Sequence, residues 1–229
     1  MITRHCRNLA PAAIAVLLSA GAVSAATVSF DLTGSDTGGH ASLPSSFSMA
    51  DKGITATFKA GSFTALSASG GPSGGFVFDT ASFATDPRIG RDGSGAGVTS
   101  SASDTSSTVD GRGGADFIEM EFSEDVTLTR LVFGAVSDND DFQWMFDLNG
   151  DGRIGVGDFL SAARNDDPLS GFTTYSGRVW GVLAAGTNDN WTLNSVTVAG
   201  PAVIPLPAGL PLLLGGLGSL AVLRRRRKT

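Results

Sequence analysis

Apolar and polar residues alternate along four stretches of the chain between residues 26 and 200. These stretches are "TVSFDL" (27–32), "ITATFKA" (54–60), "DFIEMEF" (116–122) and "WTLNSVTV" (191–198). Successive side chains of a β-strand point to opposite faces, so each stretch predicts a strand with one buried face. Helical periodicity is scarce, and turn-forming clusters of Gly, Ser and Asp separate the stretches. The pattern predicts an all-β domain over 26–200, an antiparallel β-sandwich of the jelly-roll or lectin-like kind.

The buried faces of these strands are predicted to form the core. They carry Val28, Phe30, Leu32, Ile54, Ala56, Phe58, Ile118, Met120, Phe122, Leu193, Val196 and Val198. Glu119 and Glu121 alternate with the apolar residues of the third stretch, so both are expected on its solvent face. Residues 90–114, "GRDGSGAGVTSSASDTSSTVDGRGG", contain few apolar side chains and predict a long surface loop.

Residues 1–25 have the organisation of a secretory signal peptide. Arg4 and Arg7 form a charged start, an apolar stretch follows, and small residues lead up to Ala25. Cleavage by signal peptidase between Ala25 and Ala26 is therefore predicted. The single cysteine, Cys6, leaves with this segment. The exported domain is then expected to depend on its core, on bound metal, or on both, because it has no disulfide.

The C-terminal segment, residues 201–229, has the pattern of a membrane anchor. Residues 202–223 carry no charge, and roughly twenty apolar residues in a helix span the hydrocarbon core of a bilayer. Prolines interrupt the first third, so a regular transmembrane helix is predicted from about Leu212. The basic cluster at 224–228 is expected to stay in the cytoplasm, which leaves the β-domain on the outside.

The order of parts in this segment resembles a known sorting signal. "VIPLPAGLPLLLGGLGSLAVLRRRR" is similar to the VPLPA-CTERM variant of the PEP-CTERM signal of exported bacterial proteins. The motif is carried by Val203, Pro205, Leu206, Pro207 and Ala208, with Ile204 as an inserted departure. The resemblance implies recognition near this motif by an exosortase, a membrane-embedded transpeptidase-like enzyme. It also implies removal of the span and transfer to the cell surface or the exopolysaccharide matrix.

Processing at both ends changes the charge of the protein. The full chain has 16 basic and 22 acidic residues, but the two terminal segments hold seven of the basic residues and no acidic one. The part between them therefore has nine basic and 22 acidic residues, a formal charge of −13. Such a surface repels nucleic acid and anionic membranes and attracts divalent cations. Nucleic-acid binding is excluded as a function class.

One motif within the domain indicates metal chemistry. "DLNGDGRIGVGD", residues 147–158, matches most of the calcium-loop pattern D-x-[DN]-x-[DN]-G. The expected ligands are Asp147, Asn149, Asp151, the backbone carbonyl of Arg153, and Asp158. Gly152 suits the sharp turn of the loop, and Ile154 is expected to pack it onto the core. A structural calcium ion with a dissociation constant of about 0.1–1 mM is predicted. A polar Asn-Gly/Asp-Gly turn is the alternative.

Two further observations on this loop affect its interpretation. Eight acids lie in this region of the sequence, and their mutual repulsion favours a bound cation: Asp138, Asp140, Asp141, Asp147, Asp151, Asp158, Asp166 and Asp167. Asp at the last position resembles the calcium loops of dockerins. Dockerins carry two such repeats and this chain carries one, so docking to a cellulosome does not follow.

Catalytic motifs are few, and a non-enzymatic protein is predicted. After signal cleavage His40 is the only histidine, and no histidine follows Ser73 of "GPSGG", so this formal nucleophile elbow lacks its partner. Cysteine and zinc chemistry lack ligands. A glycan hydrolase with two carboxylates stays open, because such enzymes need only a carboxylate pair. The pair formed by Glu119 and Glu121 is better explained as the solvent face of a strand.

Binding of exopolysaccharide is the main alternative to a structural or adhesive role. The candidate aromatic platforms for a sugar are Trp144, Tyr175, Trp180 and Trp191. Trp144 and Trp180 lie in apolar surroundings and are expected in the core, whereas Trp191 fits either place. This hypothesis rests mainly on the sorting-signal resemblance, which is association rather than a site argument.

Overall fold

The computed structural model describes residues 25–36, 38–104, 106–112, 114–172 and 175–202. Thirteen β-strands and two short 3₁₀ turns lie within these ranges. In chain order they are β1 (Ala25–Asp31), η1 (His40–Ser42), β2 (Ser46–Asp51), β3 (Ile54–Gly70), η2 (Pro72–Gly74), β4 (Phe76–Phe83), β5 (Arg88–Asp92), β6 (Gly95–Thr99), β7 (Val109–Asp110), β8 (Ala115–Gly134), β9 (Phe142–Phe146), β10 (Phe159–Leu160), β11 (Leu169–Ser170), β12 (Gly177–Ala184) and β13 (Asn190–Ala202).

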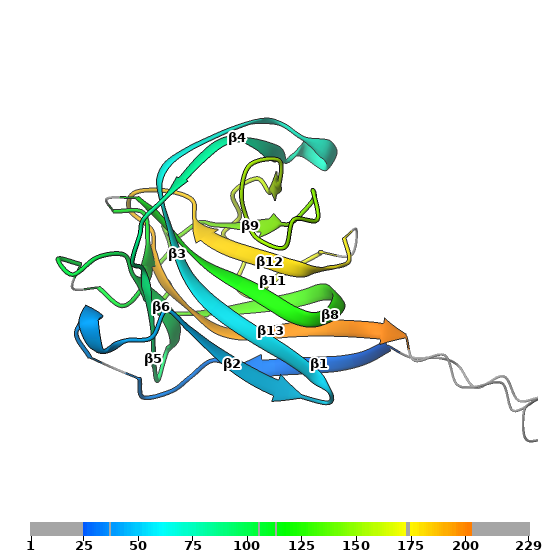
Figure 1. The fold of residues 1–229 in the computed structure, drawn as a ribbon, viewed down its shortest axis with the longest axis horizontal. Helices are drawn as coiled ribbons and strands as arrows, with labels where there is room; N and C mark the ends of the chain where they lie inside the picture. Colours follow the sequence, from blue (N-terminus) through cyan, green and yellow to red (C-terminus); the bar gives the residue numbers. More distant parts are fainter. Residues whose placement is uncertain (1–24, 37, 105, 113, 173–174, 203–229) are drawn as a thin grey trace, which may run out of the picture. The chain divides into compact units, whose positions relative to one another are not determined.

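Every strand pairing among the described residues is antiparallel, which confirms the predicted all-β, antiparallel class (Figure 1). The strands form two groups that share β8. In the first group β13 lies between β1 and residues 127–134 of β8. In the second group residues 115–122 of β8 pair with β3, and β12 lies on the other side. One long strand therefore belongs to both groups.

The main hydrophobic core joins the two groups. Phe30 of β1 contacts Phe58 of β3 and Phe122 of β8, with both ring centroids 6.2 Å away. All twelve residues predicted for the core are buried, and so is Trp191, which the sequence left open. The buried apolar side chains of β13 lie two residues apart, except that three residues separate Leu193 from Val196. The register of β13 against β8 shifts at this point, between Leu193 and Ser195. The extra residue restores the inward direction of the later side chains.

The second group of strands closes on itself. β3 pairs with both β4 and β8, and the path between these two runs through β10, β9 and β12. A smaller apolar cluster has its members on these strands and on one loop residue, Ile154. β10 contributes only two residues and is the shortest strand in this ring.

Two expectations about exposure are wrong. Residues 116–120 of β8 are all buried, and Glu119 is 8% exposed, because β3 and β12 flank the strand and the loop residue Ile154 contacts the Glu119 carboxylate. The Glu121 side chain is about half exposed, as expected. The predicted surface loop at 90–114 contains β6, which is buried throughout, and the β5–β6 hairpin. Small residues make this burial possible: a Cβ atom on Gly97 would lie 1.7 Å from the Ser107 carbonyl oxygen.

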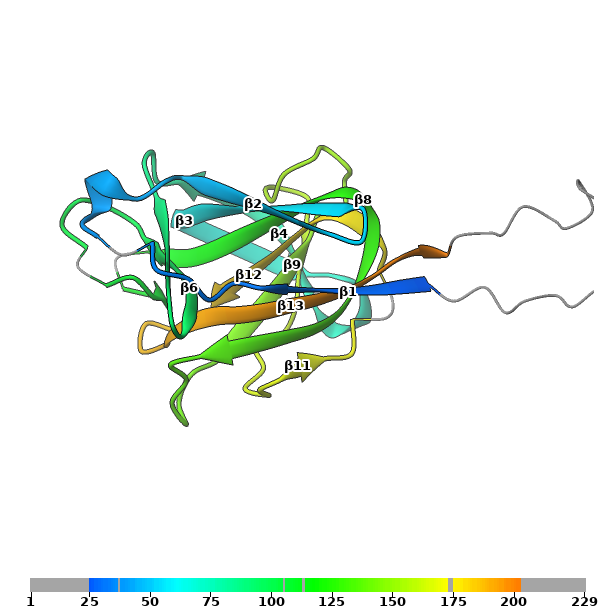
Figure 2. The same cartoon turned by 90° about the horizontal axis from the view of Figure 1, so that it is seen from below.

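β1 and β13 run side by side, with Ala25 opposite Ala202 (Figure 2). β1 begins at Ala25, one residue before the expected mature start, and β13 ends at Ala202, two residues beyond the expected boundary at 200. Of the predicted signal peptide only Ala25 is described, and of the C-terminal segment only Pro201 and Ala202; the sorting motif and the predicted transmembrane helix lie outside the described residues. Among the residues that are described, no helix has the length and apolar character needed to cross a membrane.

Candidate metal centre

The calcium-type loop connects the two strands of a hairpin. β9 ends at Phe146, immediately before Asp147, and β10 begins at Phe159, immediately after Asp158. Phe146 pairs directly with Phe159 across the hairpin. The first and last acids of the 12-residue motif are therefore brought together by the strand pairing itself.

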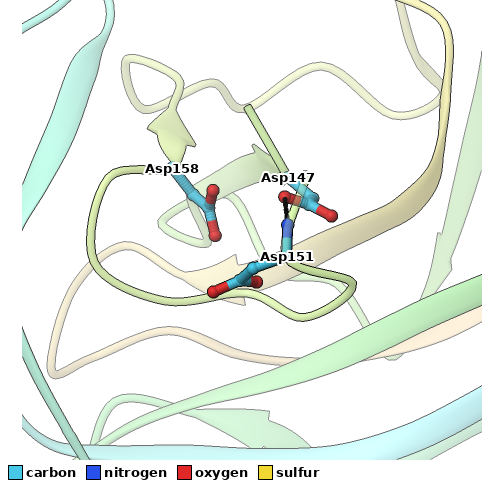
Figure 3. Close-up of side chains that lie close together, drawn as sticks. All are labelled: Asp147, Asp151 and Asp158. Atoms are coloured by element: carbon cyan, nitrogen blue, oxygen red, sulfur yellow. Dashed lines mark hydrogen bonds between the residues drawn. The ribbon is translucent and has the colours of Figure 1, made fainter. Parts of the chain in front are cut away.

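Three carboxylates of the loop converge. Asp147, Asp151 and Asp158 each present an oxygen within 4.8 Å of the other two (Figure 3). Calcium–oxygen distances are about 2.3–2.6 Å, so two oxygens on one ion can lie up to about 5 Å apart. The spacing of the three carboxylates fits a single calcium ion. No other group of three or more such side chains with this spacing occurs among the described residues.

Backbone hydrogen bonds set the shape of the first half of the loop. The Asp147 carboxylate accepts the N–H groups of Gly150, Asp151 and Gly152 at 2.7, 3.2 and 2.9 Å. Gly150 and Gly152 have φ angles of +76° and +87°, which side chains other than glycine rarely adopt. The two glycines thus allow the chain to turn around the first carboxylate.

The other two predicted ligands lie in the same loop. Asn149 accepts the Asp151 N–H at 2.8 Å through Oδ1 and donates from Nδ2 to the Val156 carbonyl at 2.9 Å. The Arg153 side chain is exposed, with its Nε 3.5 Å from Asp151 Oδ2. Its backbone carbonyl accepts no hydrogen bond from any described residue. The carbonyl is therefore available as a ligand, whereas the guanidinium group stays in solvent.

Asp158 is the innermost of the acids and is 0% exposed. Its carboxylate accepts N–H groups of Leu148, Asn149 and Gly155 at 3.0, 3.3 and 2.7 Å. Burial raises the pKa of Asp158 to about 6, and the negative charge of Asp147 adds to this, while the three N–H donors act in the opposite direction. The carboxylate joins the two ends of the loop.

The second half of the loop is attached to the domain by backbone hydrogen bonds of Gly157 and Asp158 to Phe78 of β4 and by contacts of Ile154. Ile154 is buried in the smaller apolar cluster, which confirms its predicted packing role. The Ile154 N–H donates to Glu119 Oε2 at 3.0 Å. Lys59 Nζ lies 3.1 Å from Glu119 Oε1 and 2.7 Å from Glu121 Oε2. Sequence reasoning missed this role of Glu119, because strand alternation placed its side chain in solvent.

The other five acids of this region do not join the loop cluster. Asp140 accepts the backbone N–H groups of Ser137 and Asn190 and ties two loops together. Asp166 pairs with Arg164, and Asp167 accepts the Phe133 N–H at 3.1 Å. The remaining two are Asp138 and Asp141. The negative charge at the loop is therefore smaller than the eight acids in this part of the sequence suggested.

Two of the four candidate aromatic platforms belong to the core. Trp180 and Trp191 are fully buried. Trp144 and Tyr175 are only partly buried and line a common pocket with Phe159. The expectation that Trp144 is a core residue holds in part, because its side chain packs against the main core but is only partly buried.

Comparisons of the chain with protein-family models, with curated proteins and with solved structures found no match.

Proposed function

We propose that this chain is an exported, non-catalytic protein of the cell surface or extracellular matrix whose domain is stabilised by one calcium ion. The observation that carries the metal assignment is the convergence of three carboxylates within one 12-residue loop. Export and sorting rest on the charge and hydropathy pattern of 1–25 and on the sorting-signal resemblance of 203–229. A structural or adhesive role follows from this destination. The hydrophobic core that the two strand groups share supports a β-sandwich of the jelly-roll or lectin-like kind.

The donor set favours calcium over transition metals. All the expected ligands offer oxygen, and calcium takes six to eight oxygen ligands in flexible geometry. Asp147, Asp151 and Asp158 supply carboxylates, Asn149 an amide oxygen, and Arg153 a backbone carbonyl. Water completes such a shell. Because the ion would join the end of β9 to the start of β10, its role is structural.

Thermal unfolding with and without calcium tests this assignment. At about 10 mM calcium, ten to a hundred times the expected dissociation constant, binding adds about 1.4–2.7 kcal/mol to the free energy of unfolding. For a domain of this size the melting temperature rises by about 3–11 °C. A melting temperature that is equal in calcium and in chelator, with protein shown to be metal-free, refutes the calcium site.

A conservative variant separates metal binding from general stability. Asp151→Asn keeps the acceptor for the Arg153 N–H but removes one charge from the cluster. We expect this variant to lose most of the calcium-dependent rise while its metal-free melting temperature stays close to that of the wild type. Asp138→Asn is the matched control, because Asp138 is exposed, makes no hydrogen bond to a described residue and lies outside the cluster. An equal loss in both variants contradicts a specific site.

The sorting part has a separate test. The intact mass of the protein extracted from its native cell surface is measured. A chain that ends near Pro207 or Ala208, with any attached group as excess mass, supports processing by an exosortase-type enzyme. A mass that still includes residues 224–229 leaves an ordinary membrane-anchored protein and overturns the sorting proposal.

Binding of exopolysaccharide is the second candidate function. It is favoured by the position of Trp144 and Tyr175, two partly buried aromatic side chains that share a pocket. This observation is independent of the sorting-signal resemblance.

A further inference from the structure

A pocket of about 270 Å³ lies beside the β9–β10 hairpin. Trp144 of β9, Phe159 of β10 and Tyr175, which precedes β12, contribute aromatic rings to its wall. The ring centroid of Tyr175 lies 5.6 Å from that of Trp144 and 5.1 Å from that of Phe159, and the latter two are 4.8 Å apart. The three rings form one continuous aromatic wall.

The polar atoms on two of these rings are free to bind a ligand. Trp144 Nε1 and Tyr175 Oη make no hydrogen bond to any described residue. Neither atom is among the buried polar atoms without a partner, so both reach solvent. The core tryptophans differ: Trp180 Nε1 donates to the Gly177 carbonyl at 3.1 Å, and Trp191 Nε1 is enclosed without a partner. The two unpaired donors therefore belong to residues that line the pocket.

The rest of the lining is polar and close to neutral. It includes Ser161, Arg164 and Ser170. Arg164 Nε donates to Asp166 Oδ2 at 2.9 Å, and the same carboxylate oxygen accepts from Nη2, which offsets the guanidinium charge. None of the described lining residues is a carboxylate, so the pocket offers no acidic metal ligand. An aromatic wall with hydroxyl and N–H groups suits a ligand with an apolar face and a hydroxylated edge.

The size of the pocket and the charge of the domain limit the class of ligand further. Pockets for drug-sized ligands have about 300–1,000 Å³, so this pocket suits one small ring. The formal charge of −13 between the terminal segments disfavours polyanions. A neutral pyranose meets both conditions, since its C–H face packs on aromatic rings and its hydroxyl groups exchange hydrogen bonds with the polar edge.

The pocket is built on the same hairpin as the metal loop. Phe159 directly follows Asp158, and Trp144 lies three residues before Asp147. Trp144 and Ser161 join the two arms, because the Trp144 N–H donates to Ser161 Oγ and the Ser161 N–H to the Trp144 carbonyl, both at 2.9 Å. Ordering of the loop therefore affects both strands of the hairpin, β9 with Trp144 and β10 with Phe159.

We propose that this pocket binds one neutral pyranose unit of a polysaccharide and that calcium in the 147–158 loop orders it for binding. The calcium-dependent part rests on the proposed metal site, whereas the pocket assignment does not. The proposed site consists of the aromatic wall formed by Trp144, Phe159 and Tyr175. Two of these side chains also offer unpaired donors, Trp144 Nε1 and Tyr175 Oη.

Tyr175 provides a direct probe, because it is the only tyrosine in the chain. Protein with ring-labelled tyrosine gives one set of tyrosine NMR signals. These signals are followed while calcium-loaded protein is titrated with neutral oligosaccharides of glucose, galactose, mannose and N-acetylglucosamine, and with an oligouronate. We expect saturable shifts with at least one neutral oligosaccharide and none with the uronate. Shifts with the uronate alone overturn the neutral ligand class.

Two variants and a chelator complete the test. Trp144→Phe keeps an aromatic ring in the wall but removes Nε1, and we expect it to weaken binding about fivefold or more. Phe83→Ser is the control, since Phe83 is 45% exposed and lies outside this pocket. It should bind like the wild type. Chelation of calcium should weaken binding by about the same factor as Trp144→Phe, under conditions where the protein stays folded.

The possible failures are distinguishable. If no oligosaccharide shifts the Tyr175 signals in protein whose melting temperature responds to calcium, the pocket assignment is wrong and the metal site stands. If a sugar binds equally well with calcium and after chelation, the coupling between loop and pocket is wrong. Equal weakening by Trp144→Phe and Phe83→Ser also overturns the pocket assignment.

Discussion

Asp116 is a buried carboxylate without a hydrogen-bond partner among the described residues. It lies on β8 opposite Ser62 of β3 and is 0% exposed. Neither of its oxygens accepts a hydrogen bond of standard geometry from a described residue. Burial raises the pKa of Asp116 to about 8; the charges of Asp110 and Asp104 add to the rise, and the nearby Ser62 hydroxyl and Asp110 peptide offset part of it. The ionised form therefore destabilises the folded state.

The effect on stability follows from proton linkage. In the unfolded chain the Asp116 carboxyl has its ordinary pKa of 3.8, so the folded state binds the proton more tightly. Below pH 4 both states are protonated and the group contributes no cost. Between pH 4 and 8 each pH unit lowers the free energy of unfolding by about 1.4 kcal/mol, which amounts to about 4 kcal/mol at pH 7. Above pH 8 the cost is constant.

The substitution Asp116→Asn isolates this cost, because asparagine has a similar shape and does not ionise. The free energy of unfolding is measured by urea denaturation from pH 5 to pH 7.5 at fixed calcium concentration, for the variant and the wild type. The free energy of unfolding of the variant minus that of the wild type should increase by about 3 kcal/mol from pH 5 to pH 7.5. The other titrating groups contribute equally to both proteins and cancel in this difference. Asp138→Asn should run parallel to the wild type. A variant-minus-wild-type difference that does not change with pH refutes the reasoning.

The remaining predictions concern a buried contact and a close approach of two backbones. Glu119→Gln disturbs the contacts of Glu119 with the Ile154 N–H and the Lys59 ammonium group, so urea denaturation should give a loss of about 1–2 kcal/mol. Glu121→Gln, on the same lysine but half exposed, should lose less than about 1 kcal/mol; an equal loss argues against the role of Glu119. Gly97→Ala places a Cβ atom 1.7 Å from the Ser107 carbonyl oxygen and should cost about 3 kcal/mol, seen as a lower melting temperature. A Cβ atom added at Gly93 has no neighbour within 4 Å, so Gly93→Ala should melt within about 2 °C of the wild type. Similar melting temperatures of the Gly97→Ala and Gly93→Ala variants contradict the steric argument.

Alternation predicted the strands whose two faces differ and failed where they do not. β1, β3 and β13 were found from their apolar positions, including Phe30, Phe58 and Val198. β8 was found as a strand, but its exposure was wrong, because burial of a strand on both faces depends on partners distant in sequence. β6 was missed altogether, since Gly-Ala-Gly is buried through backbone contact rather than through large side chains.

The metal loop was predictable because its ligands are local in sequence. Asp147, Asp151 and Asp158 follow from a spacing rule, and the paired hairpin strands bring the ends of the loop together. The support from Glu119 is 35 residues away and left no signal in the pattern. The pocket was likewise hidden, because a partly buried Trp144 and a core tryptophan have the same kind of sequence surroundings.

The position of the metal loop fits the weakest part of the strand ring. β10 has two residues and pairs with both β9 and β4, and a few backbone hydrogen bonds of the residues next to it, between Asp158 and Phe78 and between Ser161 and Trp144, extend this short pairing. The twelve residues before it lose conformational entropy when they order, and strand pairing alone offers little in return. Contacts within the loop offset this cost through Asp147, Asp158 and Ile154. A cation held by both ends of the loop would act at this point, which is why calcium should matter more to this hairpin and its pocket than to the main core.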